Sequence, residues 1–176
     1  MIVPRYYEDL KIMHENTLPP RAYYIPSSKP EPDPVEARSS SDRLLSLNGS
    51  WYFRYYESIY DLTEHFYKTD FLPKDFTTVL VPGVWQNYGY DTHQYTNIRY
   101  PFPLDPPYVP QENPCGAYIR QFSYRKDPAA PKAYLTFEGV DSCFYVWLNG
   151  NYVGYSQVSH ASSEFDVTDF LKEGSN

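Results

Sequence analysis

The sequence predicts a mainly β protein, built as an antiparallel β-sandwich. Short runs rich in aromatic and β-branched residues follow one another at close spacing, and turn residues separate them. Aromatic residues make up 19% of the chain, and 20 residues are tyrosine, which suits half-buried strands. The chain also contains 17 prolines, which disfavour helices and favour ordered loops between short strands.

Residues 1–42 are expected to form a proline-rich, irregular leader ahead of the sandwich. The segment from Leu18 to Pro34 contains six prolines, which exclude both a helix and a central strand. It also carries Tyr23, Tyr24 and Ile25, and a disordered tail would rarely contain three bulky apolar residues in a row. The leader is therefore expected to lie against another surface.

Residues 43–176 are expected to form the sandwich. Asn48 and Gly49 predict a turn that leads into the first strand. Alternate side chains of this strand point to opposite faces, which separates Trp51, Phe53 and Tyr55 from Tyr52, Arg54 and Tyr56.

The clearest helix candidate is the segment YDLTEHFYK, residues 60–68. Asp61 and Glu64 have the spacing of a capping box, although Ser or Thr usually heads this motif. In such a helix the side chains that face the domain would be those of Leu62, His65 and Phe66.

A short strand is expected to begin at Thr77 and to be stopped by Pro82, and further strands are expected at residues 117–125 and 133–139. Residues 143–157 predict a hairpin that turns at Asn149 and Gly150, because this pair tolerates positive φ angles. Residues 162–174 predict one more strand followed by a helical turn.

Charge and cysteine content exclude several classes of function. The formal net charge is −7 and Lys and Arg never form a run, so no nucleic-acid or membrane partner is expected. No segment is apolar enough to span a membrane, and the N-terminus lacks the apolar core of a signal peptide. Cys115 and Cys143 match no metal-binding pattern, so we expect no metal site and a cytoplasmic protein with reduced thiols.

Groups that could catalyse a reaction are sparse. Four acidic residues stand near predicted strand ends, where carboxylates ordinarily face solvent or cap turns: Glu138, Asp141, Glu164 and Asp166. The four histidines have no Ser or Cys in a recognisable nucleophile turn, and no glycine-rich phosphate loop is present. No catalytic residue is therefore predicted in these 176 residues.

The irregular segment from Gly83 to Gly116 is the best candidate for binding, because unstructured stretches of this length in a compact domain are usually functional. Its aromatic faces could stack on a sugar ring, and its planar amides match neighbouring sugar hydroxyls. In an extended backbone Tyr95, Asn97 and Arg99 point to one side. The alternative is a well-packed loop whose amides bond to their own backbone.

Two long segments carry a pattern that is specific to one family: VPGVWQNYGYDTHQYTNIRYPFPLDPPYVPQENPCGAYIRQF (81–122) and FEGVDSCFYVWLNGNYVGYSQVSHASSEFDVTDFL (137–171). They closely resemble the sugar-binding domain of the large bacterial β-galactosidases of glycoside hydrolase family 2. The resemblance reaches back through SLNGSWYF (46–53) and, more loosely, through YYEDLKIMHENTLPPRAYY (6–24) in the leader.

The resemblance implies a jelly-roll β-sandwich, like that of galactose-binding domains, at the N-terminal end of a longer enzyme. This enzyme would hydrolyse terminal β-D-galactosides such as lactose with retention, by two glutamates of a following TIM barrel. That barrel would also hold most ligands of the enzyme's Mg and Na ions. The resemblance assigns substrate binding to Asn97 and Ile98, and the residues considered as their support are Tyr95, Tyr100 and Trp85.

The resemblance further implies that the sandwich is incomplete at its C-terminus. In the family, a segment like FLKEGSN is followed by another strand and by an active-site aspartate. The jelly roll would then stop before its last strands and leave an uncovered sheet edge. The family's leader contributes to subunit contacts, so RAYYIP (21–26) is an expected interface segment and the enzyme an expected homo-oligomer.

Two other functions stay open on the residues alone. The chain could be a free-standing carbohydrate-binding module, which predicts measurable affinity for galactosides. It could also be a structural domain for oligomer assembly, in which Asn97 is incidental. The isolated chain is expected to bind sugar weakly, because one amide without surrounding walls cannot offset the entropy lost on binding.

Overall fold

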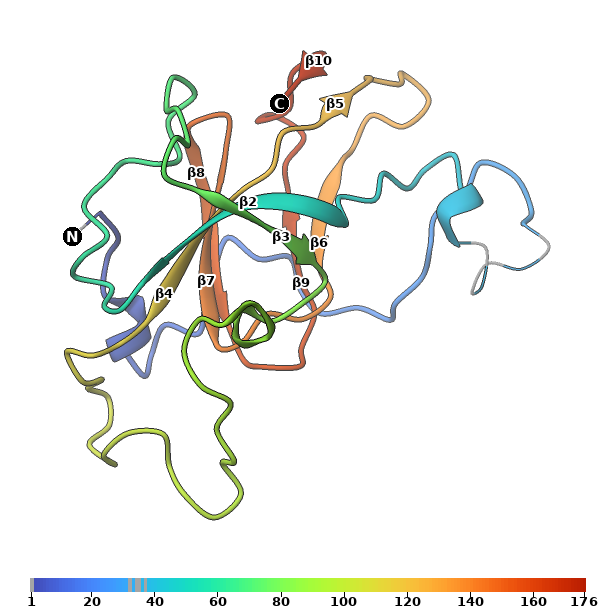
Figure 1. Cartoon of the computed structure of the whole chain (residues 1–176). Helices are drawn as coiled ribbons and strands as arrows, with labels where there is room; N and C mark the ends of the chain where they lie inside the picture. The colour runs from blue at the N-terminus through green and yellow to red at the C-terminus, as the bar shows by residue number, and fades with distance from the viewer. Residues whose placement is uncertain (1, 32, 34–35, 37) are drawn as a thin grey trace.

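The computed structural model describes residues 2–31, 33, 36 and 38–176 (Figure 1). Its strands are β1 (His14–Glu15), β2 (Gly49–Tyr56), β3 (Thr77–Val81), β4 (Cys115–Ile119), β5 (Ser123–Tyr124), β6 (Tyr134–Phe137), β7 (Cys143–Leu148), β8 (Asn151–Gln157), β9 (Ser163–Asp166) and β10 (Gly174–Ser175). Three short 3-10 turns are η1 (Tyr6–Glu8), η2 (Arg38–Ser40) and η3 (Trp85–Tyr88). In the described part of the chain, no helix is long and apolar enough to cross a membrane.

The strands form two layers, and every pairing between described strands is antiparallel. The first layer has the order β3-β2-β4, and the second contains β1-β8-β7 together with the pair β6-β9. The short pair β5-β10 lies at one end of the layers, and β2 runs across β7, β8 and β9 in the view of Figure 1. The predicted mainly β, antiparallel fold is thus confirmed.

The first predicted strand is β2, and its alternation is confirmed. Phe53 has no exposed surface on one face, and Tyr56 is 6% exposed on the other. Phe53 stands opposite Tyr118 of β4, whereas Tyr56 joins a buried cluster with Ala117. Both faces of this strand are therefore covered, one by the second layer and the other by aromatic residues outside the sandwich.

The hairpin predicted over residues 143–157 is β7 and β8, and it turns where expected. Asn149 has a φ of 52° and Gly150 a φ of 82°, so both adopt the left-handed backbone that a tight type I′ turn requires. The hairpin packs against β9 in the larger core cluster, in which Phe165 is completely buried.

The helix predicted over residues 60–68 is wrong, since this segment is a series of turns. Phe66 and Tyr67 both pack against Trp147, with ring centroids 5.7 and 4.9 Å away. Successive residues of a helix diverge by about 100° and could not both face one ring. The contacts with Trp147 therefore override the local helical pattern.

The side chains of this segment behave partly as predicted. Leu62 is buried and Phe66 packs against the core, whereas His65 is exposed. Glu64, expected to cap the helix, instead forms an ion pair with Arg54 of β2 at 2.9 Å.

The later strands are confirmed with shorter bounds. Residues 77–83 contain β3, residues 133–139 contain β6 and residues 162–174 contain β9 followed by a turn. The strand expected at 117–125 is divided into β4 and β5.

The leader is mostly irregular, and it contributes one short strand, β1, that lies ahead of the proline-rich segment. In β1, His14 pairs with Ser156 and Glu15 with Tyr155 of β8, so the leader extends the second layer. Pro32 and Pro34, two of the six prolines counted above, lie outside the described residues.

Candidate functional site

The segment that leads into the long loop is fixed on the outer face of the first layer. η3 places the Trp85 ring 6.2 Å from Phe53 and 5.6 Å from Tyr55, measured between centroids. A glycine at position 116 makes this packing possible. A Cβ there would lie 2.6 Å from the Phe53 ring and 3.1 Å from Trp85.

Two tyrosines complete this root of the loop, which we define as residues 85–90. The Tyr88 hydroxyl accepts a hydrogen bond from the backbone N–H of Leu80 at 2.8 Å. Tyr90 stacks on Tyr55 at 5.5 Å and meets Phe53 edge-on at 5.2 Å. The chain therefore leaves the sheet from a rigid aromatic base.

Beyond Tyr90 the loop projects away from both layers (Figure 1). Tyr95, Ile98 and Tyr100 expose 73%, 75% and 75% of their surface. Asn97 is also exposed, and its Nδ2 donates a hydrogen bond to the Tyr95 hydroxyl at 2.8 Å. We call residues 95–100 the loop tip.

The structure thus divides the two residues expected to bind substrate and the three considered as their support. Tyr95, Asn97, Ile98 and Tyr100 share the exposed tip, and Trp85 belongs to the packed root. The Asn97 amide is oriented by Tyr95 through its nitrogen, and its oxygen has no hydrogen-bond partner among the described residues. The tip therefore offers one oriented amide and exposed apolar side chains.

Three of the four acidic residues near strand ends, Glu138, Glu164 and Asp166, occupy structural positions. Hydrogen bonds from Arg38 and Tyr23 hold the pKa of Glu138 below its usual value. Glu164 receives two hydrogen bonds from Arg21, at 2.9 and 2.5 Å, which lower its pKa although burial opposes this.

Asp166 caps the turn that follows β9. Hydrogen bonds from the side chain and backbone of Thr168 lower the pKa of this carboxyl, and Lys132 lies 3.0 Å away. The fixed partners of these three carboxyl groups stabilise their ionised form, as is usual for acidic residues with a structural role.

The described residues offer no cluster of three or more His, Cys, Asp or Glu side chains that could hold a metal ion. Cys115 and Cys143 are free thiols, and burial raises the pKa of Cys115 to about 12.

A wide cleft borders both layers, and most of the loop tip lies outside it. Its lining includes Thr96, whereas Tyr95, Asn97, Ile98 and Tyr100 are not among the residues around it. The tip therefore has no enclosing wall within the described chain. Chemically, it can orient one or two hydroxyls of a ligand that another surface holds.

Comparison with known proteins gives the family of this domain. A family model described as "Glycosyl hydrolases family 2, sugar binding domain" matches residues 44–176. The chain belongs to glycoside hydrolase family 2. The resemblance that the sequence showed is therefore confirmed, and the domain is a sugar-binding domain of this family.

The family 2 domain has close relatives among β-galactosidases. One from Staphylococcus xylosus is 46% identical over 177 residues, covering 100% of this chain and 17% of the relative. One from Actinobacillus pleuropneumoniae is 46% identical over 176 residues, again 100% of this chain and 17% of the relative. The chain thus spans a small part of the curated relatives it matches.

A solved structure agrees on the fold. A β-glucuronidase from an uncultured Clostridium sp. is 21% identical over 74% of this chain and 20% of that chain, with a TM-score of 0.51. At this identity the likeness supports the family 2 β-fold alone.

The residues that position the loop were not predicted to do so. Tyr88, Tyr90 and Gly116 fix the root, yet only their proximity in the fold reveals this. A glycine directly before an aromatic-rich strand was the available signal, because a missing Cβ often marks a close approach.

Proposed function

We propose that this chain is the N-terminal sugar-binding domain of a β-galactosidase that hydrolyses terminal, non-reducing β-D-galactose residues. The observation that carries the proposal is the 46% identity with two β-galactosidases over the whole chain. In this proposal the full-length enzyme is a retaining glycosidase, and this domain positions the substrate without supplying the catalytic glutamates.

The proposed contact residues are Asn97 and Ile98. A substrate in an adjoining catalytic barrel would meet the Asn97 amide oxygen, which has no partner within the described chain, and the exposed Ile98 side chain. An amide oxygen accepts a hydrogen bond from a sugar hydroxyl, and an apolar side chain can pack on the C–H face of the ring. The contribution is geometric, because it holds the ring in the reactive orientation.

We assign the metal ions of the full-length enzyme to residues outside this chain. Mg and Na are the ions that the family resemblance leads us to expect. The chain's own residues take part in no proposed step through a metal.

The remaining proposals concern the environment of the enzyme. We place it in the cytoplasm, because its two cysteines are free and its acidic balance suits a dissolved protein.

We also propose a homo-oligomer with residues 21–26 near a subunit contact. Tyr23 and Tyr24 are each 57% exposed, which leaves apolar surface for such a contact.

The direct test is Asn97→Ala in the full-length enzyme, assayed with a β-galactoside. We expect a roughly 100-fold loss of kcat/KM, the size of effect that misplacement of a reacting group produces. Asn87→Ala is the matched control, since Asn87 is an exposed amide on η3 outside the tip. Full activity in Asn97→Ala would remove the contact role, and an absence of β-galactosidase activity in the unmodified enzyme would remove the proposed function.

A further inference from the structure

The tripeptide Leu-Asn-Gly occurs twice in the chain, as residues 47–49 and 148–150. In an Asn-Gly pair the backbone nitrogen of the glycine can attack the side-chain Cγ of the asparagine, because glycine has no Cβ that obstructs the approach. The attack requires the nitrogen and the Cγ to come into contact, so the fold decides whether it occurs. The two copies have the same local chemistry and differ in their surroundings.

The copy at residues 148–150 is held by hydrogen bonds. Asn149 has a φ of 52° in the turn between β7 and β8. Its Nδ2 donates to the backbone oxygen of Phe170 and to Oδ1 of Asn176, both at 2.8 Å. The attack would release this nitrogen as ammonia and would therefore cost both bonds. The fold thus protects Asn149.

The copy at residues 47–49 has no such restraint. Asn48 is exposed, and its side-chain amide has no hydrogen-bond partner among the described residues. Gly49 begins β2 and stands opposite Val81, the last residue of β3, so this pair ends the ladder. A terminal pair opens by fraying without loss of the inner pairs, and the opening frees the Gly49 nitrogen for the attack.

A positive charge lies beside the Gly49 peptide. Arg120 Nη1 donates to the backbone oxygen of Ser50, and Arg120 Nη2 is 3.8 Å from the position that a Cβ on Gly49 would occupy. Negative charge develops on the Gly49 nitrogen as it loses its proton and on Asn48 Oδ1 as the new bond forms. A guanidinium at this position stabilises both charges. Arg120 Nε is also buried without a hydrogen-bond partner, and a carboxylate at residue 48 would bring an acceptor to its side.

We propose that Asn48 is a site of spontaneous deamidation in the folded protein, whereas Asn149 keeps its amide. The Gly49 nitrogen loses its proton to hydroxide and bonds to Asn48 Cγ. The Cγ–Nδ2 bond then breaks, and the departing nitrogen takes a proton from water and leaves as ammonia. Water opens the resulting succinimide ring, at Cγ to give aspartate or at the main-chain carbonyl carbon to give isoaspartate. The sum is one water consumed and one ammonia released, without any oxidant or reductant.

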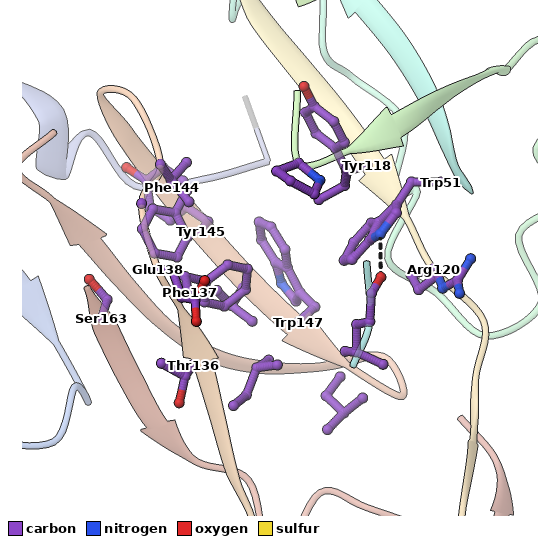
Figure 2. Close-up of a pocket in the computed structure, with 18 of the residues that line it drawn as sticks. Trp51, Tyr118, Arg120, Thr136, Phe137, Glu138, Phe144, Tyr145, Trp147 and Ser163 are labelled. Atoms are coloured by element: carbon purple, nitrogen blue, oxygen red, sulfur yellow. Dashed lines mark hydrogen bonds between the residues drawn. The ribbon is translucent and has the colours of Figure 1, made fainter. Parts of the chain in front are cut away.

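The isoaspartate product changes the start of β2. Its peptide bond runs through the former side chain, which adds one methylene to the backbone between Leu47 and Gly49. The Trp51 indole N–H donates to the Leu47 backbone oxygen at 2.8 Å, the dashed line in Figure 2, and this bond spans the lengthened segment. Trp51 and Arg120 both line the cleft (Figure 2). The modification therefore adds a negative charge and displaces an aromatic side chain at the border of the cleft.

The test is a time course of deamidation in the purified full-length protein at mildly alkaline pH. Trypsin cuts after Lys and Arg and releases residues 44–54, which contain Asn48 as their single asparagine, and residues 133–172, which contain Asn149. Mass spectrometry with fragmentation locates each replacement of NH2 by OH. A methyltransferase specific for isoaspartyl carboxylates labels the isoaspartate product. We expect both products to accumulate at Asn48 while Asn149 is unchanged.

Unfolding in urea supplies the matched control. Because both copies have the same tripeptide, Asn48 and Asn149 should react at similar rates once the fold is lost. The difference between folded and unfolded protein then measures the effect of the structure alone. An Asn48 that reacts in urea but not in the folded protein would overturn the inference. Equal modification of the two asparagines in the folded protein would overturn it as well.

Variants of Arg120 test the role of the charge. Arg120→Gln removes the charge and should slow the modification of Asn48, whereas Arg120→Lys keeps the charge and should retain most of the rate. An unchanged rate in Arg120→Gln would overturn the role given to the guanidinium. If neither variant folds, added salt tests the same point in the unmodified sequence, because screening of the guanidinium should slow the reaction at Asn48.

Asn48→Asp separates the effect of the new charge from that of the longer backbone. This variant carries the charge on a normal peptide bond. We expect the isoaspartate fraction to unfold at a lower urea concentration than freshly purified Asn48→Asp, and equal midpoints would overturn the predicted displacement of Trp51. The inference does not rest on the proposed function. A protein without galactosidase activity could still deamidate at Asn48, so the two failures are distinguishable.

Discussion

The interior of the second layer and the loop tip use the same kind of side chain for opposite purposes. Tyr155 of β8 has no exposed surface, and its ring packs 4.7 Å from Tyr145 and 5.4 Å from Tyr6. Tyr100 of the loop tip is 75% exposed. A tyrosine-rich composition therefore combines two populations, one that stabilises the sandwich and one that is available for contact with another surface.

The root of the loop connects these two regions. Trp85 and Tyr90 pack on β2 as core residues do, yet they belong to the segment that carries the tip. The exposed contact residues of the tip are thus carried by a segment that is anchored on β2. Substitutions in the interior should thus change stability, and substitutions at the tip should change activity alone.

The largest effect on stability is expected from Phe165→Ala. Phe165 is completely buried in the larger core cluster, and truncation of a buried Phe typically costs about 3–5 kcal/mol. Tyr100→Ala is the matched aromatic control and should change the free energy of unfolding by less than about 0.5 kcal/mol. Urea unfolding of both variants, followed by near-ultraviolet circular dichroism, measures the difference. Similar losses in the two variants would contradict the division into two populations.

A smaller loss is expected where the backbone of the leader meets the core. A Cβ on Gly154 would lie 2.7 Å from the Phe165 ring and would also meet the backbone oxygen of Glu15. Gly154→Ala should therefore destabilise the protein by about 1–3 kcal/mol through overpacking. A Cβ on Gly139 would have no atom within 4 Å, so Gly139→Ala should leave the midpoint of the same unfolding curve nearly unchanged. An unchanged unfolding midpoint in Gly154→Ala would mean that β1 is not tightly packed against this part of the core.

The features that could be predicted from the sequence are those with a local cause. The alternation of β2 and the turn at Asn149 and Gly150 depend on neighbouring residues, and both are as expected. The helix over residues 60–68 and the strand β1 could not be predicted correctly, because their conformations depend on distant partners. Those partners are Trp147 for the first and β8 for the second.

The predictions about the candidate site also divide into those with a local cause and those that depend on distant parts of the fold. The physics of aromatic and amide side chains made the loop between Gly83 and Gly116 the best candidate for binding, but left open a well-packed loop without a ligand. Asn97 became the central residue only through the family resemblance, and its role in catalysis stays a prediction. Trp85 was grouped with the tip residues because it is near them in sequence, whereas the fold places it in the root.

The smallest effect on stability is expected at the contacts between the leader and the strands β6 and β9. These contacts are neither buried like the core nor fully exposed like the loop tip. Arg38 lies 2.7 Å from Glu138, which also accepts a hydrogen bond from Tyr23 at 2.7 Å. Exposed pairs of this kind contribute about 0–1 kcal/mol. The pKa of Glu138 is lowered in the folded protein, so its contribution is present above the unfolded pKa and is lost as the pH falls through the folded value.

As the pH falls below about 4.5, the leader should therefore detach from the sheet before the sandwich unfolds. Digestion with an acid protease across this range should cut near residues 21–26 first and leave β7 and β8 intact. Arg38→Gln removes the partner that lowers the pKa of Glu138 most. This variant should show faster cleavage already at neutral pH, with a neutral protease, and a weaker dependence on acid. Cleavage that is independent of pH and of Arg38 would mean that β1 and Arg21, not the contacts of Glu138, hold the leader against the sheet.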